Sequence, residues 1–507
     1  MHAYTDILSR LFSTSFIQIF RSIIVFFISV ILARKLGSEA FGNYAFLTAA
    51  FIQVWSLIDG GFQNSFYTNL SSKNQGKNFY TYSLALILLQ LMISSLLILL
   101  FLSTNFLDFF FLTKNRELIF WAFLSIISQK SFLNNATLIA ESMRKNFYGN
   151  IFELIAVSFQ ILSIVILFSM NISDLDRIFM FITFANLASC ALSILFIKRE
   201  YLDLNISFRE YFDSTIIYMR PLLLFSWISF SVQFFDIWIL SKIGGFTEQS
   251  YFQVAHRFSL IFIVFLVALN NINWKETAEL NENKRISELY DYVFNIMRYV
   301  CCAAIIFSLF LFANSENLLT VFFGKEYVTS ASILTFELMM LNIIFHSVGV
   351  VSTSSFYGSK RASVIVFFQS FALITGLFLS IYLVADNSFF RFGLDLGSSG
   401  LALKILIIST IFHLGSYLYF FKDSNFKYSN LLKPIVIQLF TVSFLAIPTS
   451  LIINLFINSP FPSLAINALF YFSAISIIFL IYPKSLAIKN YEKDYFFGYL
   501  KKSLISN

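Results

Sequence analysis

The sequence contains little charge. Only 12% of its 507 residues are Asp, Glu, Lys or Arg, whereas a soluble domain has roughly 25%. Hydrophobic residues make up 58% of the chain, and the mean hydropathy is +0.76. A chain this apolar lacks the polar surface needed to face water, so it must face lipid. The longest polar stretches, near 199–215 and 271–290, are too short to bury a core of their own. We therefore expect no soluble domain.

Cysteine is also scarce. Cys190, Cys301 and Cys302 all fall in apolar segments, which argues against a disulfide framework or a zinc site. The sequence shows no nucleotide-binding loop, no Ser/His/Asp constellation and no metal-ligand spacing. It also shows no long outer loop of the kind that membrane glycosyltransferases and polymerases usually need. We therefore expect a protein that is not an enzyme, with no metal and no bound cofactor. We read the first apolar segment as a retained helix and not as a cleaved signal peptide.

Apolar runs dominate what is present. About fourteen of them reach the roughly 20 residues that cross about 30 Å of hydrocarbon. They predict an all-α integral membrane protein with spans at 13–34, 41–63, 80–102, 117–140, 148–170, 177–197, 221–241, 250–273, 292–313, 331–352, 363–385, 400–421, 434–456 and 462–482. Two further segments, 203–216 and 315–325, are expected to form short interfacial helices.

Basic residues predict the orientation. If the N-terminus is cytoplasmic, most of the 35 Lys and Arg residues fall in inner loops and tails. A minority falls in outer loops: Arg34, Lys35, Lys114, Arg116, Arg177, Lys242, Lys325 and Arg391. This asymmetry favours two cytoplasmic termini and an even number of spans. We interpret the formal net charge of +7 as a signal of topology and anionic lipid contact, and not of nucleic-acid binding.

A weak internal repeat relates two helix connections. ILARKLGSEAFGNYAF (31–46) and ILSKIGGFTEQSYFQV (239–254) share a Leu, a basic residue, a Gly, a polar turn and a Tyr that opens the next helix. Because six spans is an even number, two such halves would have the same orientation in the membrane. We therefore predict an N-terminal lobe at 1–200, a C-terminal lobe at 201–425, and two additional helices with a cytoplasmic tail at 426–507.

Polar residues inside the predicted spans follow helical spacing. Span 221–241 has a polar face at i, i+3, i+7 and i+10, and five other spans each have an ionisable residue in or near such a stripe. This pattern is typical of a water-filled cavity lined by a subset of helices. The residues on these faces are Thr14, Gln18 and Arg21; Ser56, Asp59 and Gln63; Lys130, Asn134, Thr137 and Glu141; Glu153 and Gln160; Ser226, Ser229, Gln233 and Asp236; and Gln253 and Arg257.

The deepest charges are basic. Arg21, Lys130 and Arg257 would attract an anion in a space of low dielectric constant, and arginine has a planar fork suited to phosphate oxygens. We therefore predict that these three residues bind an anionic head group. The lipid tail of such a cargo could stay in the bilayer while its head crosses.

The acidic residues allow more than one interpretation. Asp59, Glu153 and Asp236 could bind H⁺ or Na⁺ that drives transport, or could form ion pairs in the cavity. Asp59 and Glu153 could instead sit near the cytoplasmic helix ends, and Asp236 could pair with Arg257.

Three other residues within the spans are expected to have structural roles only. We expect His346 and His413 to form hydrogen bonds that hold helices together. Lys404 is expected to extend its ammonium group to the outer membrane surface.

Four stretches in the same order also resemble the bacterial polysaccharide-repeat flippases of the Wzx type. This family belongs to the multidrug, oligosaccharidyl-lipid and polysaccharide exporter superfamily. Two differences concern gating positions: many members have a basic residue where this chain has Phe66 to Thr68, and a Pro where it has Trp274 and Lys275. The stretches are LARKLGSEAFGNYAFLTAAFIQVWSLIDGGFQNSFYTNLSS (32–72), RPLLLFSWISFSVQFFDIWILSKIGGFTEQSYFQVAHRFS (220–259), LLTVFFGKEYVTSASILTFELM (318–339) and LGSSGLALKILIIS (396–409).

The resemblance implies two six-helix lobes arranged in a V, as in MATE transporters, that open alternately to each side of the bacterial cytoplasmic (inner) membrane. The implied cargo is an undecaprenyl-pyrophosphate-linked oligosaccharide for O-antigen, capsule or exopolysaccharide assembly. A polysaccharide polymerase and chain-length machinery are the implied partners, beside membrane lipids. In related lipid II flippases, arginines on the first and eighth helices engage pyrophosphate, and Arg21 and Arg257 lie on the corresponding helices. A multidrug or cation antiporter of the same superfamily remains the alternative.

Overall fold

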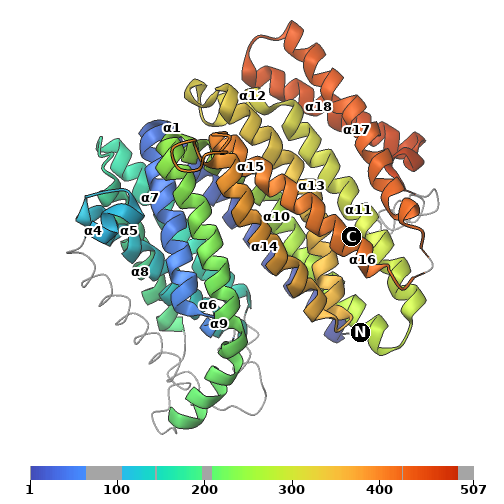
Figure 1. Cartoon of the computed structure of the whole chain (residues 1–507), viewed down its shortest axis with the longest axis horizontal. Helices are drawn as coiled ribbons and strands as arrows, with labels where there is room; N and C mark the ends of the chain where they lie inside the picture. Colours follow the sequence, from blue (N-terminus) through green and yellow to red (C-terminus); the bar gives the residue numbers. More distant parts are fainter. Residues whose placement is uncertain are drawn as a thin grey trace. The chain divides into compact units, whose positions relative to one another are not determined.

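The computed structural model describes residues 2–63, 65, 105–142, 146–196, 208–424 and 426–488. Within these ranges every regular element is a helix (Figure 1). Nine helices of the described part are long and apolar enough to cross a membrane, and one of them, Ile17–Asp59, has 43 residues, enough for two crossings. The chain is therefore a multi-pass, all-α integral membrane protein.

The chain divides into two compact units. Unit 1 comprises Met1–Gln253 and Ser380–Asp395, and unit 2 comprises Val254–Leu379 and Leu396–Asn507. This division reflects the density of contacts within each unit. It does not test the predicted domains, which stay a prediction: an N-terminal lobe at 1–200, a C-terminal lobe at 201–425 and two additional helices at 426–507.

Unit 1 is a group of helices in which α1 contacts α5, α7 and α9, and α8 packs against α5 and α7. Its π-helical segments η1 and η3 continue the α-helices before them. The elements are α1 (His2–Asp59), α4 (Asn105–Phe111), α5 (Arg116–Ile127), η1 (Ser128–Leu133), α6 (Asn134–Ser142), α7 (Asn146–Ser169), α8 (Leu175–Phe196), α9 (Phe208–Ile239) and η3 (Leu240–Gly244).

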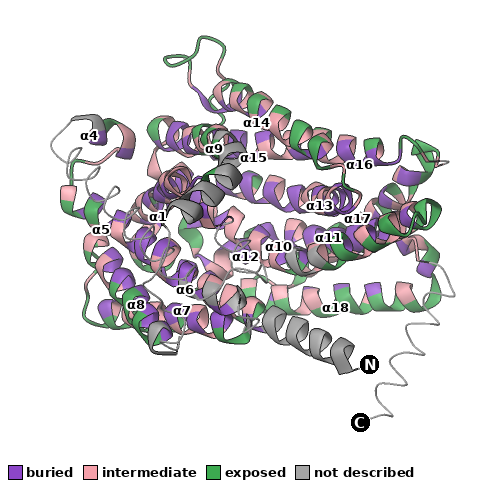
Figure 2. Ribbon diagram, turned by 90° about the horizontal axis from the view of Figure 1, so that it is seen from below, coloured by how far each residue is buried: buried purple, intermediate pink, exposed green. Residues whose placement is uncertain are grey.

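Unit 2 is organised around α13, which packs against α11 and α15 and is largely buried (Figure 2). Helices α10 (Gly245–Glu282) and α14 (Ala362–Val384) each have residues in both units. The other elements are α11 (Ile286–Ala313), α12 (Ser315–Phe322), η4 (Lys325–Tyr327), α13 (Ser330–Gly358), α15 (Gly397–Ile408), η5 (Ser409–His413), α16 (Leu414–Phe420), α17 (Tyr428–Phe456), α18 (Pro460–Ile481) and η6 (Pro483–Leu486).

The helices match the sequence prediction closely. Each predicted span coincides with helical residues, except 80–102, which lies outside the described residues. The predicted short helix at 315–325 is α12 followed by η4, whereas residues 208–216 belong to α9 itself. The polar residues of 208–216 form the first turns of α9, which continues through Pro221, and residues 203–207 lie outside the described residues.

Large apolar side chains are exposed on the outer helices, as a lipid environment requires. Phe440, Phe444 and Phe456 on α17 are 76%, 73% and 83% exposed, and Leu469 on α18 is 70% exposed. Apolar surface on this scale would destabilise a protein in water. In a bilayer it faces acyl chains, while the helical hydrogen bonds satisfy the backbone.

Helices α17 and α18 are attached to unit 2 by polar contacts. The Gln438 amide on α17 donates to the backbone oxygens of Arg298 (3.1 Å) and Leu486 (2.8 Å). On α18, the Tyr471 hydroxyl donates to Ile306 O at 2.8 Å, and the Asn467 amide donates to Asn314 Oδ1 at 2.7 Å. In a membrane the hydrophobic effect does not hold helices together, so such hydrogen bonds and close packing take its place.

The two repeated connections have the same backbone conformation. Gly37, where α1 kinks, has φ 78° and ψ 173°, and Gly245, which follows η3, has φ 80° and ψ 175°. This region of φ and ψ is essentially restricted to glycine. The two glycines are aligned in the repeat that the sequence shows, so the structure supports that repeat. The connections also touch, since a Cβ on Gly42 would lie 1.7 Å from Phe246 O.

Candidate functional site

Arg21 of α1 forms an ion pair with Glu153 of α7 inside unit 1. Three residues earlier on both helices, Gln18 Nε2 donates to Asn150 Oδ1 at 3.4 Å. Because the contact moves by three residues in the same direction on each helix, α1 and α7 run parallel here. This direction agrees with the predicted topology, in which they are the first and fifth spans.

Lys130 lies in the π-helical segment η1, between α5 and α6. Arg21 lies within electrostatic range of the Lys130 ammonium group. A π-helical segment widens the helix locally and is frequent at functional sites. The structure thus brings together two of the three predicted anion-binding residues and one predicted acid. We call Arg21, Lys130 and Glu153 the unit 1 charge cluster; it holds two positive groups and one negative group.

Gln63 connects the end of the first helical pair to η1. Its amide nitrogen donates to Lys130 O at 2.6 Å, and its amide oxygen accepts from Asn134 Nδ2 at 2.8 Å. The sequence placed Gln63 and Asn134 on polar faces of two different spans, and the structure shows that these faces meet. The contacts fix the backbone that presents Lys130.

Asp59 has a capping role in the structure. Its carboxylate accepts from the backbone nitrogens of Gly61 (3.3 Å) and Gln63 (3.2 Å). The turn is made by Gly60 and Gly61, with φ of 51° and 92°. These donors lie two and four residues after Asp59, so the carboxylate satisfies backbone N–H groups of the turn that follows α1. The carboxylate therefore stabilises the end of α1, and its use in ion coupling stays a prediction.

Asp236 of α9 accepts a hydrogen bond from the Ser380 hydroxyl of α14, within unit 1. One turn earlier, the Gln233 amide nitrogen donates to Ser229 Oγ (2.5 Å), and Gln53 Nε2 donates to Gln233 Oε1 (3.2 Å). The polar face predicted for this helix therefore contacts polar groups on two other helices. Pairing of Asp236 with Arg257 stays a prediction.

Arg257, the third predicted anion-binding residue, lies on α10 in unit 2 and is half-buried. Its charge acts on the adjacent His256 imidazole, which is in turn influenced by His346 of α13. His346 and His413 have ring centroids 5.8 Å apart. Sequence reasoning did not predict this grouping, because the three histidines are far apart along the chain. The one available signal was that these are three of only four histidines.

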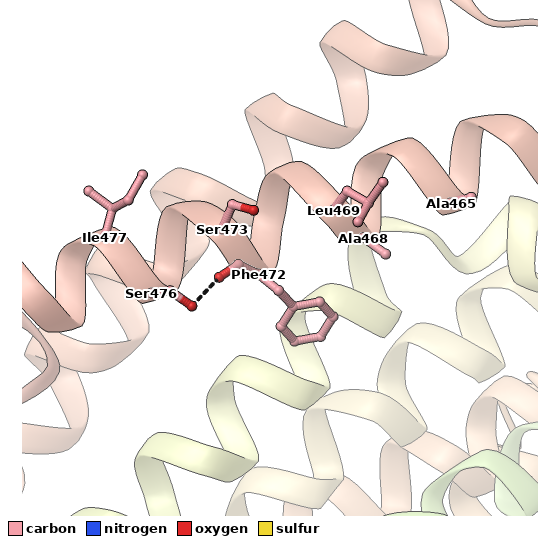
Figure 3. A pocket seen from close by; sticks show the side chains of 7 residues that line it. All are labelled: Ala465, Ala468, Leu469, Phe472, Ser473, Ser476 and Ile477. Carbon is pink, nitrogen blue, oxygen red and sulfur yellow. Dashed lines mark hydrogen bonds between the residues drawn. The ribbon is translucent and has the colours of Figure 1, made fainter. Parts of the chain in front are cut away.

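Two hollows are present outside these clusters in the described part of the chain. A pocket of about 430 Å³ lies at the repeated connections of unit 1, lined by Glu39, Asp108, Lys114 and Lys242 among others, and there Arg116 pairs with Asp108 at 2.6 Å. A groove of about 790 Å³ follows one face of α18 (Figure 3). Its lining is apolar apart from Ser473 and Ser476, so it presents no charge to a head group.

No grouping of three or more His, Cys, Asp or Glu side chains that could hold a metal ion occurs among the described residues. The three cysteine thiols are buried and unlinked.

Neither a family model nor a curated relative matches this chain. Several solved structures have a similar fold. The lipid II flippase MurJ, in an inward closed conformation, has a TM-score of 0.69 and 16% identity, covering 92% of this chain and 98% of that one. An inward-facing multidrug resistance MATE family transporter of the MOP superfamily has a TM-score of 0.65 and 14% identity, covering 80% and 96%. The Vibrio cholerae MATE transporter VcmN has a TM-score of 0.55 and 13% identity, covering 84% and 99%.

These similarities confirm the predicted fold class. The chain has the all-helical membrane fold shared by MurJ and the MATE transporters of the MOP superfamily.

Proposed function

We propose that this protein is a flippase that moves undecaprenyl-pyrophosphate-linked oligosaccharide repeat units across the bacterial cytoplasmic membrane by alternating access. The units would serve assembly of O-antigen, capsule or exopolysaccharide. A polymerase and chain-length machinery would be its partners, and both termini would be cytoplasmic. Support comes from the fold, which is similar to that of a lipid II flippase, and from the motifs of the polysaccharide-repeat flippases.

The observation that carries the proposal is the unit 1 charge cluster. A charge at the centre of a bilayer costs about 2.5–3.5 kcal/mol on insertion scales. Glu153 compensates Arg21, Lys130 lies within electrostatic range of Arg21, and we propose that Lys130 is positively charged when the cargo binds. An excess positive charge of this kind attracts an anion such as a pyrophosphate strongly where the dielectric constant is low. Arg257 in unit 2 is proposed to contribute in the same way.

A multidrug or cation antiporter is the second candidate, because MATE transporters have the same fold. Organic cations would be expected to bind to acidic and aromatic groups. The cations of the unit 1 charge cluster outnumber its one acid, which favours the flippase. Transport could be coupled to H⁺ or Na⁺ through Glu153, Asp236 or Asp59.

Complementation tests the proposal. A strain that lacks its own repeat-unit flippase would express the wild-type chain, Arg21→Ala or Arg257→Ala, and surface polysaccharide would be measured at equal protein levels. We expect the wild-type chain to restore polysaccharide and each variant to reduce it at least about tenfold, as loss of one charged hydrogen-bonding partner would predict. Arg177→Ala is the matched control, since the Arg177 side chain is 52% exposed and its ion pair among the described residues is with Asp174, which directly precedes α8. Normal polysaccharide from both test variants would contradict the cationic site.

A further inference from the structure

Unit 2 contains three histidines on separate elements: His256 of α10, His346 of α13 and His413 of η5. The rings of His346 and His413 lie 5.8 Å apart, with planes inclined by 66°. His256 lies within electrostatic range of His346. Each of the three is half-buried, and His346 is near the middle of the 29-residue helix α13. We call these residues the histidine cluster.

His413 is held in a defined orientation. Its Nδ1 lies 3.1 Å from Phe345 O, and because a carbonyl oxygen only accepts, Nδ1 carries the hydrogen. In the neutral ring Nε2 is then the site with a lone pair that accepts a proton. The ring lies directly against Gly349, where an added Cβ would be 2.5 Å from His413 Cγ. A larger residue at 349 would displace the ring, so glycine there is required for this arrangement.

The surroundings of the histidine cluster contain both cationic and neutral titratable groups. Arg257 is next to His256 and acts on it electrostatically, while His346 acts on His413. Elements packed against α13 add Lys404 on α15, which is buried beside Gly376 of α14 and does not extend to the surface as the sequence predicted. The others are Cys301 on α11 and Tyr417 on α16, which act on each other.

We propose that His256, His346 and His413 form a proton-binding site in unit 2, and that a proton bound there strengthens the binding of an anion at Arg257. The second half of this inference rests on the proposed function. Imidazole is the side chain whose charge ordinarily changes between pH 5 and 8. Because the rings are neighbours, the first proton disfavours a second, and the cluster titrates as a unit. The added charge increases the positive potential at Arg257, and by linkage a bound anion favours protonation equally.

Nuclear magnetic resonance of histidine side chains tests the proton site without any cargo. With only four histidines in the chain, the full-length protein labelled with ¹⁵N in the histidine rings gives few signals. We expect coupled titration between about pH 4 and about pH 9, and a shift of about one pH unit in the His413 midpoint on His346→Gln. His2→Gln is the control and should leave the other titrations unchanged. Signals that do not titrate, or that titrate independently of one another in the wild-type chain, would overturn the proposal.

Binding of farnesyl pyrophosphate to the protein in nanodiscs tests the linkage. Affinity should fall about tenfold from about pH 4 to about pH 7, as expected for losing one nearby charge. In the triple variant His256→Gln, His346→Gln and His413→Gln the dependence should shrink to that caused by titration of the probe itself. An unchanged pH dependence in this variant would overturn the link to anion binding. Absence of probe binding to the wild-type chain at every pH would instead contradict the proposed function, and the resonance titration would still decide the proton site.

Discussion

At the scale of single residues, the charges inside the helices differ in their surroundings. Glu153 neutralises Arg21, Asp59 caps a turn and Asp236 accepts from a serine. Lys130 has Arg21, a like charge, beside it. The sequence predicted that these residues lie on polar helix faces, and the contact of Gln63 with Asn134 joins two of the predicted faces. The sequence did not show which faces meet, because helical spacing defines a face of one helix but not the helix that packs against it.

The Arg21–Glu153 pair gives the first residue-scale prediction. Glu153→Ala should lower the free energy of unfolding by about 1–3 kcal/mol, because removing one partner leaves a charge uncompensated. The value stays below that of a fully buried pair since Arg21 is 34% exposed. The double variant Arg21→Met with Glu153→Leu should lose less stability than the sum of the single changes.

The measurement is thermal unfolding in detergent at one protein concentration. Asp174→Ala serves as the control, because its pair with Arg177 is exposed and should contribute less than about 1 kcal/mol. If Glu153→Ala and Asp174→Ala unfolded at the same temperature, the Arg21–Glu153 ion pair would contribute no more to stability than the exposed Arg177–Asp174 pair.

At the scale of elements, the spans were predictable because long apolar runs must be helical in lipid. The π-helical segments η1, η3 and η5 were not predictable, since they depend on contacts such as that between Gln63 and Lys130 O. The grouping of the histidines could not be predicted from the sequence either, because the prediction would require knowledge of how α10, α13 and η5 pack. The repeat was visible as a weak pattern, and its glycines turned out to share one conformation.

Those glycines give the element-scale prediction. Gly37→Ala and Gly245→Ala should each destabilise the protein by about 1–3 kcal/mol, because alanine rarely adopts this backbone conformation. The two costs should be similar, since φ and ψ agree at both positions. The yield of folded protein and its unfolding temperature measure the effect.

Gly415→Ala is the matched control for these variants. An added Cβ there would meet only Phe368 Cε1, at the ordinary distance of 3.5 Å, so stability should hardly change. Full stability of Gly37→Ala would show that the kink of α1 is not needed for the fold.

At the scale of the whole molecule, the chain is a multi-pass membrane protein with the fold of MurJ and the MATE transporters. The distribution of Lys and Arg predicts its topology, with both termini cytoplasmic. The parallel direction of α1 and α7, seen in the Gln18–Asn150 and Arg21–Glu153 contacts, agrees with that topology.

Reporter fusions test the topology. A cytoplasmically active reporter should be active when fused after Asn507, and so should one inserted between Lys360 and Arg361. A reporter inserted beside Arg391 should be active only if it works outside the cell. Activity of the cytoplasmic reporter at Arg391 would invert the predicted orientation.

The most direct test of the central claim is transport by the purified protein. Proteoliposomes would contain a fluorescent undecaprenyl-pyrophosphate oligosaccharide, and its movement between leaflets would be followed by loss of protection from a membrane-impermeant quencher. The account predicts rapid movement with the wild-type chain, at least about tenfold slower movement with Lys130→Gln, and normal movement with Arg177→Ala. Equal rates for wild-type and Lys130→Gln proteins, or no movement with any of them, would contradict a flippase that uses an intramembrane cationic site.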